Sequence, residues 1–206
     1  MKDLCRLLPH SRLYNTYAST ETGIIATYNF NDGRCMAGCL GRPMRHAQFV
    51  ITSEGRIVCT GPTLMSGYAG DPERTASVLR DGKLYTSDLG EIDGEGMLHL
   101  SGREDDIINV GGYKVSPLEV EDAALSSPLV ADCLCIPAPH PVTGQALKLL
   151  VVSTAGTAFS KRTLALFLSK CLERYKVPLL YEEVPAIRRT FNGKPDRKSY
   201  LTEASN

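Results

Sequence analysis

Residues 102–121 read GREDDIINVGGYKVSPLEVE, and this stretch decides how the rest of the chain is interpreted. Its charged run at 103–106 separates two parts of different character. After a pair of glycines, Ser116-Pro117-Leu118-Glu119 has the pattern of a capping box with proline at the first helical position. A helix is therefore predicted from residue 117 to about Ser126, with Glu119 serving mainly as part of the cap.

The residues after this stretch alternate between strand and helix patterns. Apolar runs at 130–136 and 147–153 predict two strands, and a third is expected near 180–184. A second helix is predicted to begin at Ser160, because the apolar residues that follow fall on one helical face: Leu164, Phe167, Leu168, Cys171 and Tyr175. A short final helix is expected from Pro195. Residues 105–206 are thus predicted to form a small α+β domain.

The first hundred residues carry strand and turn signals instead. A hairpin is predicted over residues 47–60, and short strands at 83–86, 89–92 and 98–101 are separated by Asp81-Gly82 and Asp93-Gly94. Many short strands with glycine turns favour an antiparallel, barrel-like β subdomain. The predicted fold class is therefore α+β, with a β-rich first domain over residues 1–104.

The composition limits the partners and the compartment that we expect. Of 206 residues 43% are hydrophobic, and 23 basic residues balance 23 acidic ones, so no electrostatic argument favours nucleic acid. No apolar run approaches the ~20 residues that span a bilayer, and the N-terminus lacks the apolar core of a signal peptide. Seven irregularly spaced cysteines suit buried thiols better than disulfides or a metal site. A cytoplasmic protein is expected.

Four short motifs occur in an order that resembles one enzyme superfamily. They are Tyr17-Ala18-Ser19-Thr20-Glu21, Tyr85-Thr86-Ser87-Asp88, the stretch at 102–121, and Asn192-Gly193-Lys194-Pro195-Asp196-Arg197. Together they resemble the C-terminal part of the adenylate-forming (AMP-dependent synthetase/ligase) enzymes, closest in type to acyl-CoA synthetases. The resemblance implies that residues 1–104 end a large domain and that residues 105–206 form a mobile lid.

The resemblance implies nucleotide-binding roles for residues of the first part. Tyr17 would stack on the adenine of ATP or AMP, and Thr20 would hydrogen-bond the phosphates. Glu21 would bind Mg²⁺, for which a carboxylate is a hard oxygen ligand. Asp88 would accept hydrogen bonds from the ribose hydroxyls, and Arg103 would contact ribose or phosphate.

The resemblance also implies how the second part acts. Asp105 occupies the hinge position, at which the lid rotates between the two half-reactions. After rotation Gly111 and Gly112 would line the tunnel for the CoA thiol, where glycine allows a close approach of backbone. Lys114 would contact a phosphate as a point charge. Lys194 would touch the substrate carboxylate and the α-phosphate during adenylation, stabilising the charge that develops there.

Each of these residues also has an ordinary structural interpretation. The segment at 17–21 has the composition of a polar loop, and Asp88 precedes Leu89-Gly90 as a turn aspartate often does. Arg103 can form a surface ion pair with a neighbouring aspartate, and the glycine pair can be a simple turn between strands. Lys194 can be a solvated member of a basic loop.

The expected function is ATP-dependent activation of a carboxylic acid to an acyl-adenylate, followed by transfer to CoA. The Ser/Thr/Gly-rich loop that holds the β- and γ-phosphates in this superfamily has no counterpart in these residues. We therefore expect that the chain alone does not complete the activation, and that a companion chain or self-association covers an exposed apolar face. Fatty, aromatic and amino acids all stay open as substrates.

Two other functions stay open at this point. The same architecture can serve a carrier-protein phosphopantetheine, as in an adenylation domain, although no carrier domain follows in these residues. Alternatively, the chain can be a non-catalytic remnant that serves as a nucleotide-binding or interaction module.

Overall fold

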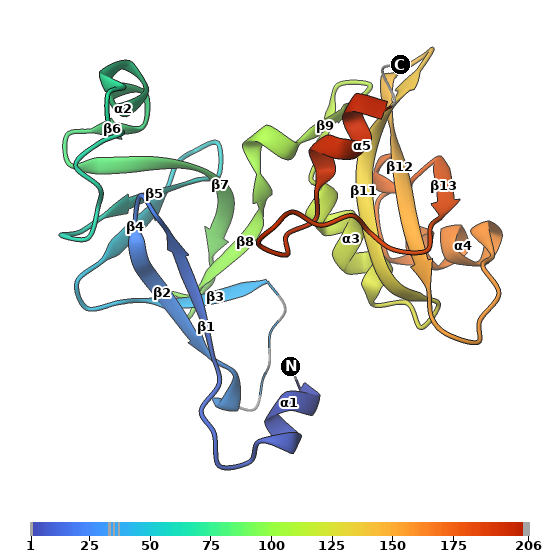
Figure 1. Ribbon diagram of the computed structural model, residues 1–206, viewed down its shortest axis with the longest axis horizontal. Coiled ribbons are helices and arrows are strands. Elements are labelled where there is room, and N and C mark those ends of the chain that lie inside the picture. The colour runs from blue at the N-terminus through green and yellow to red at the C-terminus, as the bar shows by residue number, and fades with distance from the viewer. Residues whose placement is uncertain (1, 33, 35, 37, 204–206) are drawn as a thin grey trace. The chain divides into compact units, whose positions relative to one another are not determined.

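The structure is a computed structural model of the chain, and it describes residues 2–32, 34, 36 and 38–203. The chain forms two compact units, Met1–Asp105 and Asp106–Asn206. Figure 1 colours the first unit from blue to light green and the second from there to red. None of the described helices has the length and apolar character needed to span a membrane.

The first unit is built mainly from antiparallel strands. Its helices are α1 (Lys2–Leu7) and α2 (Pro72–Val78), with the 3-10 turns η1 (Phe30–Asp32) and η2 (Glu104–Asp106). Its strands are β1 (Tyr14–Ser19), β2 (Gly23–Asn29), β3 (Cys39–Pro43), β4 (Gln48–Ile51), β5 (Arg56–Thr60), β6 (Leu79–Arg80), β7 (Lys83–Ile92) and β8 (Leu98–Arg103). They pair in the order β1-β2-β3-β8-β7-β5-β4, with β6 beside β7.

The predicted antiparallel sheet is confirmed, but it is not a barrel. In the described residues the pairing ends at β1 on one side and at β4 on the other, so the sheet is open. The predicted hairpin at 47–60 is confirmed as β4 and β5, which pair from Gln48 with Thr60 to Ile51 with Ile57. Buried Ile25, Ile57 and Leu98 belong to the apolar core beneath these strands.

Two strands predicted at 83–86 and 89–92 are one continuous strand, β7. The register of β7 against β8 shifts between Leu89 and Gly90, so the glycine marks a bulge and does not end the strand. A side chain at Gly90 would place its Cβ only 2.4 Å from the backbone oxygen of His99. Glycine is therefore required here by the close approach of two backbones.

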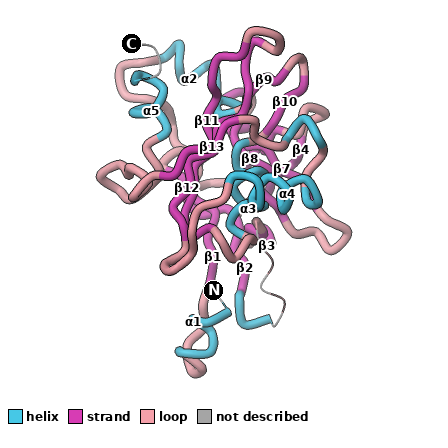
Figure 2. Tube along the Cα trace, turned by 90° about the vertical axis from the view of Figure 1, so that its right-hand side faces the viewer, coloured by secondary structure: helices cyan, strands magenta, loops and turns pink. Residues whose placement is uncertain are grey.

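The second unit is a five-stranded sheet with helices. It contains β9 (Ile108–Val110), β10 (Tyr113–Val115), α3 (Pro117–Leu125), β11 (Val130–His140), β12 (Gly144–Ser153), α4 (Lys161–Cys171), η3 (Arg174–Lys176), β13 (Leu180–Glu183) and α5 (Arg197–Glu203). The long strands β11 and β12 form an antiparallel hairpin, and β13 runs parallel to β12. The helices α3 and α4 lie next to each other (Figure 2). The α+β fold class is thus confirmed.

Apolar side chains cover both faces of this sheet. On the face of α3 and α4, the buried core includes Val120, Leu149, Leu164 and Leu168. Leu164 and Leu168 are buried as the helical periodicity predicts. Leu134, Ile136 and Leu150 point to the other face, where Ile187 and Tyr200 pack against them. The prediction for Cys171 is wrong: α4 ends at this residue and its side chain is exposed.

The helix predicted at 117 is present, but its capping box is not formed. Among the described residues the Ser116 side chain makes no capping hydrogen bond. Glu119 instead accepts a hydrogen bond from the Lys176 ammonium at 2.7 Å. A charged donor is a stronger partner for a carboxylate than a backbone N–H, and Pro117 already favours the helix start.

Candidate functional site

Two residues predicted to bind nucleotide meet in the first unit. The Tyr17 hydroxyl, on β1, donates a hydrogen bond to Oδ2 of Asp88, on β7, at 2.6 Å. Burial, and then the neighbouring Asp88 carboxylate, raise the pKa of Tyr17 well above its ordinary value. Arg103 pairs with Asp88 in the β7–β8 register, and its Nε lies 3.7 Å from Oδ1. Asp88 therefore lies between a neutral phenol and a guanidinium.

The direction of the Asp88 side chain is fixed by its own strand. The Thr86 hydroxyl donates to the carbonyl of Ile57 at 2.8 Å and accepts from the backbone N–H of Asp88 at 3.1 Å. These bonds tie the backbone N–H of Asp88 to Thr86, and Thr86 to Ile57 on β5. Asp88 is thus more firmly placed than a turn aspartate would be.

Glu21 lies in the turn between β1 and β2. Ser19 and Thr22 hold this turn by reciprocal bonds, in which each hydroxyl accepts from the other residue's backbone N–H, at 3.2 and 3.0 Å. The Tyr68 hydroxyl donates to Oε1 of Glu21 at 3.2 Å. The pKa of Glu21 is below its ordinary value, chiefly because its own backbone N–H bonds the carboxylate, and then because Ser19, Tyr68 and Arg74 favour the anion.

A cavity of 360 Å³ brings Glu21, Tyr68, Asp88 and Arg103 together. Charged and hydroxyl groups dominate its lining, which consists of Ser19, Glu21, Tyr68, Arg74, Ser77, Val78, Leu84, Tyr85, Thr86, Ser87, Asp88, Arg103 and Asp105. Thr20 is exposed in the same turn as Glu21, and neither Thr20 nor Tyr17 belongs to this lining. Asp105, the expected hinge, lies in η2 with its Oδ2 at 3.5 Å from Nη2 of Arg103.

Sequence reasoning missed Tyr68 and Arg74, which belong to this cavity. Arg74 lies on α2, and its guanidinium lies 4.1 Å from the centroid of the Tyr68 ring, in a cation–π contact. Asp71 caps this helix by accepting from the backbone N–H of Arg74 at 2.9 Å, and Pro72 occupies the first turn. The pair Asp71-Pro72 is a recognisable helix start, so this signal could have found α2.

The other predicted residues lie in the second unit. Gly111 and Gly112 form the turn between β9 and β10 with φ of 59° and 96°, a region that favours glycine. Nothing lies within 4 Å of where a Cβ on Gly112 would be, so this site is open. Lys114 is exposed on β10.

Lys194 lies exposed in a tight loop that precedes α5. The backbone N–H of Thr190 donates to the carbonyl of Lys194 at 2.7 Å, and the N–H of Gly193 donates back to Thr190 at 2.8 Å. Gly193 has a φ of 80°. The loop therefore closes on itself and presents the lysine to solvent.

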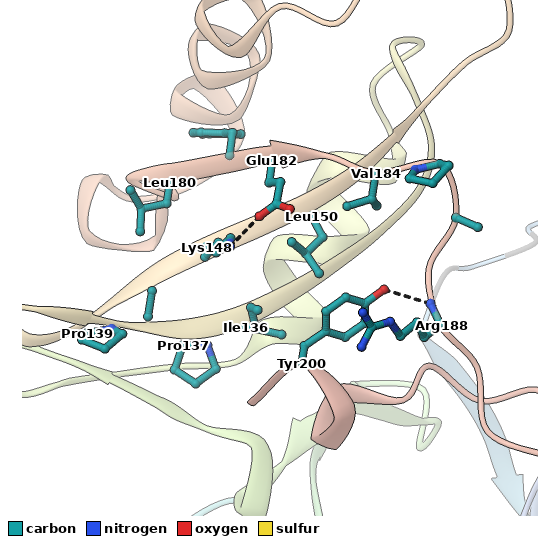
Figure 3. Close-up of a pocket in the computed structure, with 14 residues that line it drawn as sticks. Ile136, Pro137, Pro139, Lys148, Leu150, Leu180, Glu182, Val184, Arg188 and Tyr200 are labelled. Carbon is teal, nitrogen blue, oxygen red and sulfur yellow. Dashed lines mark hydrogen bonds and ion pairs between the residues drawn. The ribbon is translucent and has the colours of Figure 1, made fainter. Parts of the chain in front are cut away.

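The second unit also has a cavity of 710 Å³, which lies elsewhere (Figure 3). Its lining is apolar around Ile136, Leu150 and Val184, and it includes an ion pair at 2.5 Å between Lys148 on β12 and Glu182 on the neighbouring β13. None of the residues that the sequence predicted for function lines this cavity. The smaller, more polar cavity of the first unit has the groups that suit a nucleotide.

Comparisons with known proteins agree on the class of protein. Residues 119–194 match the family described as the AMP-binding enzyme C-terminal domain. A long-chain-fatty-acid–CoA ligase of Bacillus subtilis is 34% identical over 203 residues, which cover 93% of this chain and 36% of that protein. The fold is an adenylate-forming fold, and the chain belongs to the adenylate-forming superfamily that includes the acyl-CoA ligases. The predicted resemblance to this superfamily is thereby confirmed.

Two solved structures show the same fold. The amide bond synthetase McbA from Marinactinospora thermotolerans has a TM-score of 0.86 and 32% identity, covering 93% of this chain and 42% of that one. The o-succinylbenzoate CoA synthetase MenE of Bacillus subtilis, solved with its acyl-adenylate intermediate, has a TM-score of 0.84 and 26% identity, covering 96% and 42%. The chain thus spans less than half the length of the relatives it matches.

Proposed function

We propose that this chain contributes to the active site of an AMP-forming acid–thiol ligase. In such an enzyme the oxygen of a carboxylate attacks the α-phosphorus of ATP and releases pyrophosphate. The thiol of CoA then attacks the acyl carbonyl and releases AMP. The observation that carries the proposal is the polar cavity of the first unit, in which Asp88 is held between Tyr17 and Arg103 beside the anionic Glu21.

The side chains in this cavity, together with Tyr17 and Thr20 outside its lining, are proposed to bind a magnesium-bound nucleotide. Asp88 can accept both ribose hydroxyls. Tyr17 is assigned to adenine on the resemblance of its motif; its hydroxyl bonds Asp88, while its ring packs against the apolar core and lies outside the cavity lining. Glu21, whose charge is favoured by its surroundings, supplies a hard oxygen ligand for Mg²⁺. Thr20 and Arg103 are assigned to the phosphates, since a hydroxyl and a guanidinium both donate to phosphate oxygens. Bound Mg²⁺ would neutralise negative charge on the phosphates.

We assign residues 1–104 to the end of the large domain and residues 105–206 to the mobile lid, with Asp105 as the hinge. Lys194 would approach the α-phosphate during adenylation, because a cation there stabilises the developing charge. Gly111 and Gly112 would face the CoA arm in the second step, and Lys114 would contact a phosphate. The openness around Gly112 supports this assignment.

CoA is proposed as the acceptor because CoA ligases are among the relatives. McbA is an amide bond synthetase, so the identity of the group that accepts the acyl chain is the first feature to test. The substrate class is a carboxylic acid, and its identity depends on pocket residues outside this sequence. Buried free thiols at Cys39, Cys59, Cys133 and Cys135 suit the reducing cytoplasm, where we place the protein.

We further propose that the 206 residues bind nucleotide but do not activate a carboxylate by themselves. The relatives are more than twice as long as the matched region, and they have room for the phosphate loop and acyl pocket. These parts would come from further sequence, from a companion chain or from self-association. Carboxylate-dependent ATP–pyrophosphate exchange on this polypeptide checks the proposal. Exchange that disappears in Lys194→Ala would mean that a complete site forms.

Nucleotide binding tests the site itself. AMP and Mg·ATP are titrated into the chain by calorimetry, and Asp88→Asn should weaken binding by about tenfold or more, since charged hydrogen bonds to the ribose are lost. Asp81→Asn is the matched control, because Asp81 lies in the exposed turn before β7 with a φ of 50° that asparagine tolerates. Equal affinities of the two variants, or no binding by the parent chain, would refute the assignment.

A further inference from the structure

A buried ion pair closes the edge of the second sheet next to the lysine loop. Strand β11 pairs with β12 on one side. On its other side, the N–H of Cys135 donates to Oε1 of Glu121 at 2.7 Å, and its carbonyl accepts from Nη1 of Arg197. Glu121 is only 8% exposed. Two side chains thus take the place of a neighbouring strand at this point.

The geometry of this pair fixes the direction of Arg197. Its Nη1 and Nη2 donate to Oε1 and Oε2 of Glu121 at 2.8 and 3.2 Å, a two-point contact that a point charge cannot reproduce. Its Nε lies 4.0 Å from Asp106, the residue directly after the expected hinge. Arg197 therefore connects α3, β11 and the start of the unit.

A second arginine holds the other arm of the same loop. Nη2 of Arg189 contacts Asp132, on β11, at 2.5 Å, and its Nη1 donates to the carbonyl of Gly193 at 3.2 Å. Backbone pairing between Arg189 and Pro195 joins the two arms. The loop with Lys194 at its end is thus attached to one strand at two points, before and after the lysine.

We propose that Arg197 and Glu121, assisted by Arg189, are positioning residues for Lys194. The inference rests on the proposed function, in which Lys194 must reach the α-phosphate. A displacement of about 1 Å in a group that acts on the transition state can cost ~10²-fold in rate. Anchoring the loop to β11 keeps its backbone in place, so that only the lysine side chain has to be ordered when substrate binds.

The first test measures the loop directly. Arg197→Lys retains the charge and loses the two-point contact. Hydrogen exchange of the Thr190 and Gly193 amides should become at least about tenfold faster, while that of Leu149 in the core of β12 stays unchanged. Arg162→Lys, on the exposed side of α4, is the matched control and should change neither. Unchanged exchange in the loop of Arg197→Lys would overturn the inference.

The second test separates positioning from a general structural role. In the active enzyme that contains this chain, Arg197→Lys should lower acid-dependent ATP–pyrophosphate exchange by roughly 10- to 100-fold. Thioester formation from a synthetic acyl-adenylate and CoA should stay near the parent value, because that step does not use Lys194. An equal loss in both steps would refute positioning.

The two proposals fail in different ways. If Lys194→Ala leaves ATP–pyrophosphate exchange in the active enzyme unaffected, the proposed function is contradicted. The hydrogen-exchange measurement on the loop would still stand. Arg189→Lys serves as a second variant if Arg197→Lys does not fold, because Arg189 is 44% exposed in its pair with Asp132. Arg189→Lys should also make hydrogen exchange of the Gly193 amide faster, and an unchanged rate would count against the inference.

Discussion

Replacing Glu121 by alanine should destabilise the second unit more than any surface substitution. The side chain is buried, and its two oxygens accept three hydrogen bonds, one from Cys135 and two from Arg197. Burial raises the pKa of Glu121, against the lowering by Arg197 and the Cys135 N–H. The carboxylate is therefore tolerated here only because these donors surround it.

The expected magnitude follows from what the substitution leaves behind. Breaking a buried ion pair by removing one partner costs about 3–5 kcal/mol, since the other charge stays buried. The N–H of Cys135 also loses its acceptor, and an orphaned buried donor costs about 1–3 kcal/mol. The two losses share the same site and do not add fully, so we expect a loss of about 4 kcal/mol. A domain of this size is stable by about 5–15 kcal/mol, which leaves the variant folded but marginal.

The assay is urea unfolding followed by circular dichroism. The circular dichroism signal reports both units, because tyrosines and strands occur in each. Hydrogen exchange of the Leu149 amide in the core of β12, measured at the same urea concentrations, reports the second unit alone. Glu173→Ala removes an exposed partner of Lys176 and is the matched control, with little expected change. In a double-mutant cycle with Arg197→Ala, the two losses should couple by about 1 kcal/mol or more. A loss no greater than that of the control, or full additivity, would refute the reasoning.

Three further predictions concern the first unit. Tyr68→Phe removes a hydroxyl donor to Glu21 and should weaken Mg·ATP binding by about 2- to 10-fold in a magnesium titration; unchanged affinity would contradict the role. Asp93 has a pKa of about 2, because backbone N–H groups of its turn and then a histidine ring bond the anion. The ionised Asp93 therefore stabilises the folded state above its ordinary pKa of 3.8, and this contribution should be lost as the pH falls towards 2. The urea midpoint should fall with pH over this range, and Asp93→Asn should remove that dependence. Gly41→Ala would place a Cβ 1.8 Å from the backbone of β2 and should lower the free energy of unfolding by ~2 kcal/mol or more. Gly70→Ala is the control, because its Cβ would meet no atom within 4 Å and the loss should be smaller. Equal losses of stability in the two variants would exclude the clash as the cause.

Local sequence signals predicted the elements whose cause is local. Ser160 accepts a hydrogen bond from the N–H of Thr163 and starts α4 where the cap pattern predicts. The break expected within β7 was wrong, because Gly90 serves a contact with a distant strand. A glycine in a sequence shows that the backbone is special there and does not show whether a turn or a close neighbour requires it.

The candidate site depends on contacts that spacing in the sequence does not reveal. Motif resemblance found Tyr17 and Asp88 separately, but their hydrogen bond joins positions 71 residues apart. The bond from Tyr68 to Glu21 spans 47 residues, and Tyr68 is an ordinary aromatic residue without the structure. Such pairs follow from the order of strands in a sheet, which the alternation of apolar residues within each strand does not determine.

The distribution of charges between the two units has a consequence for the proposed mechanism. The carboxylates that suit ribose and magnesium, Asp88 and Glu21, lie in the first unit, and Lys194 lies in the second. Every contact described for the lysine loop, including those of Arg189 and Arg197, comes from the second unit itself. The loop can therefore keep its shape during the rotation that we propose at Asp105. Because that rotation would carry the lysine as part of a rigid body, the timing of adenylation would be set by the hinge and not by folding of the loop.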